Sequence, residues 1–122
     1  ALRTELAALA DRLPEPDTDA DVRLWADRVF TVRGAGTVVT GTLGAGTVRV
    51  GDELEVGDPG RRAVVRGLQS LGEPSTAVSA VARIAVNLRG LDRDSVRRGN
   101  TLRTPGAWRG TDEVDVRLRG AK

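Results

Sequence analysis

Apolar and polar residues alternate along most of the chain from residue 22 onward, and this period of two predicts β-strands. The alternation is clearest over residues 22–32, 48–56 and 82–88. Turn sequences separate the apolar runs: Gly34-Ala35-Gly36, Gly44-Ala45-Gly46, Gly57-Asp58-Pro59-Gly60 and Gly72-Glu73-Pro74. Short strands that recur roughly every ten residues, with no helical pattern between them, predict an antiparallel barrel that is closed or nearly closed.

The first residues follow a helical period instead. Four leucines between residues 2 and 13 are spaced four, three and four apart, which places them on one face of a helix that ends at Pro14. Residues 14–21 are acidic and contain proline, as expected of a linker. Because a single amphipathic helix of this length is marginal alone, its leucine face needs a partner, either in this chain or in one removed from it.

The predicted fold class is therefore all-β: an antiparallel β-barrel, preceded by a short α-helix and followed by the start of a further β-domain. A length of 122 residues is that of one ordinary domain. We place the helix and linker in residues 1–21, the barrel in residues 22–104, and a linker with the first strand of a further β-domain in residues 105–122. Thr104-Pro105-Gly106 breaks the chain there, and apolar residues then alternate again from Val114 to Leu118. This organisation is expected of a piece of a longer protein.

The composition excludes several kinds of active site. The chain has no Cys and no His, which excludes thiol and imidazole catalysis and the common zinc sites. It has no G-x-x-x-x-G-K-[ST] motif, since its only lysine is Lys122. The carboxylate pairs Asp52 with Glu53 and Asp92 with Asp94 fall in turn-like segments, where solvated surface is the simpler interpretation. We expect no catalytic residue, no metal site and no cofactor in this segment, and we expect that it is not itself an enzyme.

The chain shows no sign of a membrane protein. No apolar run approaches the roughly 20 residues needed to span a bilayer, and the apolar residues near the start are spaced rather than contiguous as in a signal peptide. The absence of cysteine fits a reducing compartment. We expect a cytoplasmic protein with no membrane partner.

Two arginines lie within predicted strands whose other residues are largely apolar. The 19 basic residues outnumber the 17 acidic ones by only two, so a basic site has to be local. In an unbroken strand Arg28 shares a face with Leu24 and Phe30, where an unpaired guanidinium is costly. Either a bulge turns Arg28 outward, or it lines a polar pocket with a partner. Arg83 faces away from the apolar residues of its strand; it is either ordinary solvated surface or part of an anion site that the small Ala85 leaves open.

Three runs of the sequence contain motifs that are specific in combination. The runs are ADRVFTVRGAGTVVTGTLGAGTVRVGDELEV, VRGLQSLGEP and ARIAVNLRGLDRDSVRRGNTL, and they cover about Trp25 to Leu102. The motifs are the strand-G-x-G-strand opening, the turn at Val50 to Asp52, the run from Asn87 to Gly90, and Arg98-Gly99. Together they resemble the second domain of elongation factor Tu-like GTPases. The resemblance implies a translation-factor β-barrel that follows a GTP-binding domain and helps hold the aminoacylated 3′ end of tRNA.

Within this family the sequence is similar to the selenocysteine-specific branch. Elongation factor Tu carries acidic residues at the positions of Asp27 and Arg28 and an amide at that of Arg83, whereas the selenocysteine-specific factor carries Asp, Arg and Arg, as this chain does. By resemblance, Asp27, Arg28 and Arg83 form the pocket for the selenocysteyl group. Gln69 and Asn87 are weaker candidates for contacts with the tRNA 3′ end.

The acidity of a selenol explains why its pocket would contain two arginines. A selenol is a stronger acid than a thiol, whose pKa is about 8.5, so at neutral pH it is largely an anion. The serine carried earlier by the same tRNA is neutral, and a cationic pocket therefore favours the selenocysteyl form. Two roles stay open for Asp27: it holds Arg28 in place, or it accepts a hydrogen bond from the α-amino group of the ester.

The resemblance implies GTP-dependent delivery of selenocysteyl-tRNA to the ribosome at a recoded UGA. The expected partners are selenocysteyl-tRNA, the ribosome, a GTP-binding domain that holds GTP and Mg²⁺, and a following β-domain. The N-terminal helix then looks like the last helix of the GTP-binding domain. Two alternatives are open: the same barrel of elongation factor Tu or of the tRNA-binding initiation factor, and a non-catalytic scaffold barrel that joins domains or binds protein.

Overall fold

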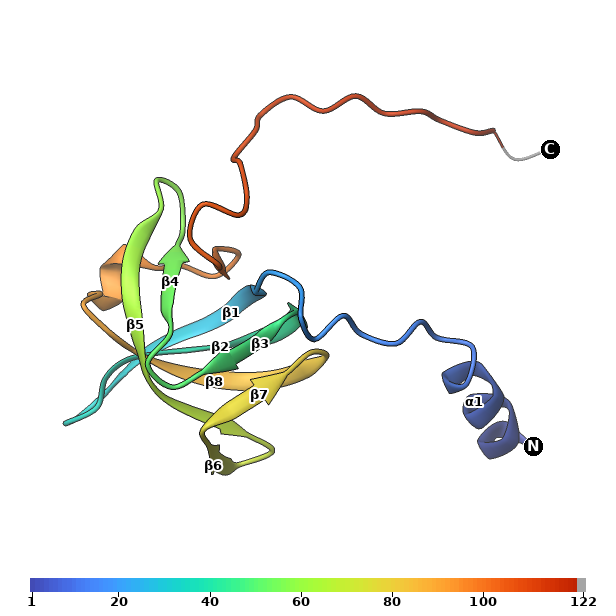
Figure 1. The fold of residues 1–122 in the computed structure, drawn as a ribbon, viewed down its shortest axis with the longest axis horizontal. Helices are drawn as coiled ribbons and strands as arrows, with labels where there is room; N and C mark the ends of the chain where they lie inside the picture. The colour runs from blue at the N-terminus through green and yellow to red at the C-terminus, as the bar shows by residue number, and fades with distance from the viewer. Residues whose placement is uncertain (121–122) are drawn as a thin grey trace.

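The computed structural model describes residues 1–120, and its folded part is a β-barrel with one short α-helix before it (Figure 1). In chain order the elements are α1 (Leu2–Ala10), β1 (Arg23–Val32), β2 (Gly36–Ala45), β3 (Thr47–Arg49), β4 (Glu53–Val56), β5 (Arg61–Ser70), β6 (Glu73–Ser75), β7 (Ala77–Ser79), β8 (Ala82–Arg89), the 3₁₀ helix η1 (Arg93–Ser95) and β9 (Thr101–Arg103).

Six strands close into an antiparallel barrel, and the predicted fold class is confirmed. Their order is β4–β9–β1–β2–β8–β5, and the pairing of β4 with β5 closes the ring. β6 extends β5 as a hairpin, while β3 and β7 form a separate two-stranded sheet. Because both ends of the strand order pair with each other, the ring leaves no free edge for another chain to pair with.

Alternating apolar side chains from every strand of the ring fill the barrel interior. The largest fully buried side chains are leucines and valines: Leu24, Leu43, Leu54, Leu88, Leu102, Val39, Val48, Val56, Val65 and Val86. The period of two sends the residues between them outward. The outer face of the strands is therefore the surface on which a binding site can be built.

β1 contains a β-bulge at Asp27, and this corrects one prediction from the alternation. The register of β1 against β2 shifts between Ala26 and Arg28, so Asp27 is the extra residue. An extra residue reverses the side that the following residues face. The unbroken strand is therefore wrong and the bulge is correct: Arg28 is exposed, Val29 packs against the core, and Phe30 is only half-buried.

α1 lies apart from the barrel, at the end of an extended segment (Figure 1). It ends at Ala10, earlier than predicted, because the ring of Pro14 clashes with a helical carbonyl four residues before it. Leu2, Leu6 and Leu9 are 55–74% exposed. The leucine face predicted to need a partner thus lies open within the described residues.

Hydrogen bonds fix the chain to the barrel where it enters the first strand and where it leaves the last. On the entry side, the Thr47 hydroxyl donates to the carbonyl of Thr18 at 2.8 Å. On the exit side, a carboxylate oxygen of Glu55 accepts from Arg103 at 2.7 Å, and the other accepts from the backbone N–H of Gly106 at 3.0 Å. Both contacts lie close to the predicted barrel limits.

After this exit, residues 107–120 contain no strand. A first strand of a further β-domain within residues 105–122 stays a prediction, and positions 121 and 122 of that range lie outside the described residues. Among residues 1–120, no helix is both long and apolar enough to cross a membrane.

Candidate functional site

Two rows of outward-facing side chains cross β1, β2, β8 and β5, which are neighbours in the barrel wall. Residues paired across the four strands make up each row. The first row contains Arg28, Thr40, Ala85 and Gln69, and the second contains Phe30, Val38, Asn87 and Gly67. Since paired residues of neighbouring strands lie about 5 Å apart, each row gathers side chains that are distant in the sequence.

Arg83 on β8 forms a two-pronged ion pair with Asp27 on β1, across the intervening strand β2. Nη2 of Arg83 donates to Oδ1 of Asp27 at 3.0 Å, and Nη1 pairs with Oδ2. The Thr40 hydroxyl of β2 donates to the same Oδ1 at 2.9 Å. The bulge makes this arrangement because it leaves Asp27 and Arg28 on one outer face, whereas neighbours in a regular strand face opposite sides.

These contacts set the charges of the group. The hydrogen bond from Arg83 lowers the pKa of Asp27 below its ordinary value; the Thr40 hydroxyl and the charges of both arginines act in the same direction, against the effect of partial burial. The same pairing raises the pKa of Arg83. Asp27 is therefore ionised at neutral pH and neutralises one of the two arginines, which leaves Asp27, Arg28 and Arg83 with one net positive charge.

Arg28 and Arg83 line one shallow hollow of about 400 Å³, which we name the arginine hollow. Its other lining residues are Phe30, Thr40, Gln69, Leu71, Gly72, Ile84 and Ala85. Among the described residues, Arg28 has no carboxylate within ion-pair distance. Its guanidinium is therefore available to an anion that enters the hollow.

A second hollow of about 340 Å³ adjoins the first and shares Phe30, Gln69 and Ala85 with it. We name it the apolar hollow; its other lining residues are Val32, Ala35, Val38, Gly67, Leu68, Pro74 and Asn87. The side-chain oxygen of Asn87 is buried and has no hydrogen-bond partner in the described part of the chain. Apolar walls with one unmet amide suit a flat ring that has a polar edge.

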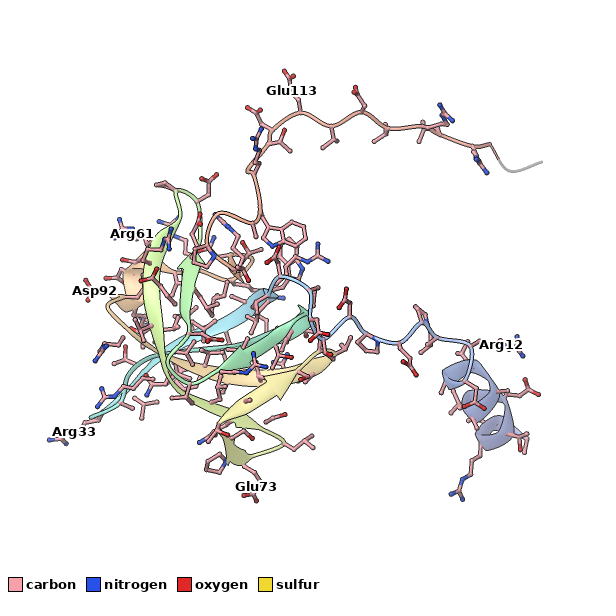
Figure 2. The ribbon with its side chains drawn as sticks, viewed as in Figure 1. Arg12, Arg33, Arg61, Glu73, Asp92 and Glu113 are labelled. Atoms are coloured by element: carbon pink, nitrogen blue, oxygen red, sulfur yellow. The ribbon has the colours of Figure 1, made fainter. Side chains whose placement is uncertain are left out.

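A third hollow, of about 580 Å³, lies on the other side of Arg28, between the bulge of β1 and the η1 segment. We name it the basic hollow; its lining residues are Asp27, Arg28, Val29, Arg93, Asp94, Val96, Arg97 and Arg98. This end of the barrel carries Arg61 and Asp92 as well (Figure 2). Four guanidinium groups against two carboxylates suit an anion with several oxygens, such as a phosphate.

The barrel matches a known protein family. A family profile described as "Elongation factor Tu domain 2" matches residues 36–103, which is more than half of the chain. The chain belongs to this family. The resemblance inferred from the sequence motifs is confirmed.

Relatives of this elongation factor Tu domain 2 barrel include an elongation factor Tu and a selenocysteine-specific elongation factor. "Elongation factor Tu 2" of Streptomyces avermitilis is 42% identical over 95 residues, which cover 78% of this chain and 24% of that protein. "Selenocysteine-specific elongation factor" of Desulfomicrobium baculatum is 47% identical over 91 residues, which cover 74% of this chain and 14% of that protein. The chain thus spans less than a quarter of either relative.

A solved structure shares the architecture. The crystal structure of a bacterial selenocysteine-specific elongation factor EF-Sec superposes with a TM-score of 0.82 at 28% identity. The match covers 95% of this chain and 21% of the other.

The five residues singled out from the sequence all lie on one face of this domain 2 barrel. Arg28 and Arg83 line the arginine hollow, and Asp27 is bound to Arg83 rather than to Arg28. Gln69 lines the arginine and apolar hollows, and Asn87 lines the apolar hollow. The structure therefore brings together residues that lie as far apart in the sequence as Asp27 and Asn87, which are separated by 60 positions.

Three further residues line these hollows but were not among the site residues predicted from the sequence. Arg93 and Arg97 line the basic hollow, and Leu71 lines the arginine hollow. The three arginines within residues 93–98 were a visible signal, but their position opposite Arg28 depends on how the chain returns to β1. Nothing in the sequence around Leu71 distinguished it from an ordinary turn residue.

Proposed function

We propose that this barrel is the second domain of a selenocysteine-specific elongation factor and that it binds the aminoacyl end of selenocysteyl-tRNA. The observation that carries the proposal is that Arg28 and Arg83, far apart in the sequence, line one hollow that adjoins an apolar one. The 47% identity with the Desulfomicrobium baculatum factor supports it.

The charge of the arginine hollow matches a selenolate. Asp27 neutralises Arg83, so the group presents one net positive charge, carried by the unpaired Arg28. A selenocysteyl group, more acidic than a thiol of pKa about 8.5, brings one negative charge at neutral pH. A seryl group brings none and leaves the guanidinium without a compensating anion. One charge-assisted hydrogen bond of about 1.5–3 kcal/mol corresponds to a preference of roughly 10- to 100-fold.

The neighbouring hollows fit the rest of a tRNA 3′ end. The apolar hollow has room for a base ring, and the unmet oxygen of Asn87 can accept a hydrogen bond from an exocyclic amino group. The basic hollow offers guanidinium groups to backbone phosphates. Asp27 already accepts hydrogen bonds from Arg83 and Thr40, which favours a role in holding Arg83 over one in binding the α-amino group.

The remaining partners follow from the same assignment. In the full-length factor a GTP-binding domain would hold GTP and Mg²⁺, and the open leucine face of α1 is suited to pack against it. The factor would deliver selenocysteyl-tRNA to the ribosome at a recoded UGA, in the cytoplasm. This segment contributes binding and no chemical step.

A second candidate is the equivalent barrel of elongation factor Tu, which the 42% identity with the Streptomyces avermitilis protein favours. A general carrier of aminoacyl groups that differ in charge gains no consistent advantage from a net positive hollow. The two candidates therefore differ in whether the barrel prefers a selenocysteyl group over a seryl group on the same tRNA.

The test is a comparison of dissociation constants for selenocysteyl-tRNA and seryl-tRNA, in a full-length factor that carries this chain and has GTP bound. Arg83→Ala leaves Asp27 free to neutralise Arg28, so we expect the preference to collapse by about tenfold or more while seryl-tRNA binding changes little. Arg49→Ala, which removes an exposed arginine outside the three hollows, is the control and should leave both constants unchanged.

Other results would contradict the proposal. If the wild type binds both tRNAs equally well, the general carrier is the better assignment. If Arg83→Ala weakens both tRNAs by the same factor, Arg83 serves the tRNA backbone or the fold rather than the selenocysteyl group.

A further inference from the structure

The tip of the β5–β6 hairpin carries a leucine in a backbone conformation that disfavours it. Leu71 and Gly72 connect Ser70 to its paired residue Glu73, and their φ angles are +53° and +76°. Positive φ at both central residues is the pattern of a type I′ turn, in which Asn-Gly is strongly preferred. Within residues 1–120, Leu71 is the only residue other than glycine with a positive φ.

The exposure of the Leu71 side chain to solvent is also unfavourable. It is 97% exposed, more than any other large hydrophobic side chain of the described chain. The residue therefore gains nothing from burial and also strains the backbone of its turn. A side chain that is unfavourable on both counts in the folded protein points to a contact made when something binds.

The position of Leu71 identifies that contact. It lines the arginine hollow together with Arg28 and Arg83. The short hairpin holds it there, because a two-residue turn between paired strands leaves the tip little freedom of direction. An apolar group at the opening of a cationic hollow can cover an occupant but cannot itself bind an anion.

We propose that Leu71 is a specificity-determining residue of the arginine hollow, whose side chain covers a bound selenocysteyl group and keeps water away from it. This inference rests on the proposed function. Opposite charges attract more strongly when water is excluded, so the cover strengthens the contact between selenolate and guanidinium. A seryl hydroxyl gains no such attraction and loses hydrogen bonds to water. The cover therefore widens the difference between the two aminoacyl groups.

The test measures dissociation constants for selenocysteyl-tRNA and seryl-tRNA in the full-length factor with GTP, for Leu71→Asn and Leu71→Met. Asn suits the turn but removes the apolar cover, and we expect selenocysteyl-tRNA binding to weaken by about fivefold to tenfold with seryl-tRNA binding changed less than about twofold. Met keeps an apolar cover and should retain the wild-type preference. Val50→Asn, an exposed valine in another turn, is the matched control.

Two outcomes overturn the inference. If Leu71→Asn weakens both tRNAs equally, Leu71 contacts a part they share or another domain of the factor. If it changes neither, Leu71 does not cover the site. Arg83→Ala measured in parallel separates this inference from the proposed function: loss of preference in Arg83→Ala but not in Leu71→Asn removes only the role of Leu71.

A second measurement needs no tRNA. Because Asn is favoured at this turn position and Leu is not, Leu71→Asn should raise the Tm of the 122-residue chain by a few °C. A lower Tm would show that Leu71 supports the fold and is not in an unfavourable position there, which would overturn the inference.

Discussion

Arg83 reaches across β2 to bind Asp27, and this one ion pair decides how charge is distributed over the candidate site. It fixes the guanidinium of Arg83 with two hydrogen bonds and leaves Arg28 as the unpaired cation of the arginine hollow. The pair also joins strands that are not hydrogen-bonded to each other, β1 and β8. A site held in this way is set before any ligand arrives, which reduces the ordering that binding requires.

The ion pair predicts how stability depends on pH. The pKa of Asp27 is lowered by folding, so its stabilising effect is present above its ordinary value of 3.8 and is lost as the pH falls through the folded pKa. We expect the difference in free energy of unfolding between wild type and Asp27→Asn to be largest near neutral pH and to shrink below about pH 4. Urea unfolding at several pH values measures it.

The control for this prediction is the same substitution in an Arg83→Ala background. Arg83 is the main cause of the lowered pKa, so Asp27→Asn should have a smaller pH-dependent effect there. An equal effect in both backgrounds would mean that Arg83 is not the partner that matters.

The contact between β1 and β2 has no room for a side chain at Gly41. An added Cβ would clash with the carbonyl oxygen of Trp25 and lie 2.9 Å from Cδ2 of Leu24. We expect Gly41→Ala to lower the free energy of unfolding by about 1–3 kcal/mol. Gly44→Ala on the same strand, where the nearest atom is 3.7 Å away, should change it far less. Thermal unfolding monitored by circular dichroism compares the Tm values of the two variants. Equal Tm values would contradict the close packing at Gly41.

Asn87 is expected to serve binding at the expense of stability. Its buried oxygen has no partner, and an unmet buried polar atom costs about 1–3 kcal/mol. Asn87→Leu should therefore raise the free energy of unfolding by about 1 kcal/mol, yet weaken selenocysteyl-tRNA and seryl-tRNA equally, because both carry the same terminal base. Chemical unfolding and tRNA titration measure the two effects.

Asn100→Leu is the matched control for Asn87. The Asn100 oxygen accepts the backbone N–H of Arg97 at 2.8 Å, so its loss should destabilise the chain. If Asn87→Leu were also destabilising, Asn87 would have a structural partner that its geometry does not show.

The basic hollow should affect both aminoacyl forms in the same way. We expect Arg97→Ala to weaken selenocysteyl-tRNA and seryl-tRNA by a common factor and to reduce the slope of log K against log salt concentration by about 0.7–0.9. The measurement is a titration at several salt concentrations, with Arg49→Ala as the control. A change in the preference between the two tRNAs would instead place Arg97 at the aminoacyl group.

Much of the fold could be read from local patterns. The alternation of apolar residues and the glycine-rich turns correctly predicted an antiparallel barrel, because a period of two and a tight turn depend on neighbours in the sequence. Leu24, Leu54 and Leu88 accordingly fill the core. The same patterns placed a helix at the N-terminus but extended it past Ala10, since the effect of Pro14 reaches back a full turn.

The site needed pairings between distant strands. Whether Arg28 lies inside or outside depends on the bulge at Asp27, and a bulge is defined by a partner strand rather than by the strand that contains it. The contact between Asp27 and Arg83 requires β8 to lie beside β2, and the position of Leu71 over the arginine hollow requires β5 to lie beside β8. The sequence by itself determines residue types and local periodicity. The register of each strand pair, and which strands are neighbours, are decided only when the barrel closes, because they depend on contacts between residues distant in the sequence.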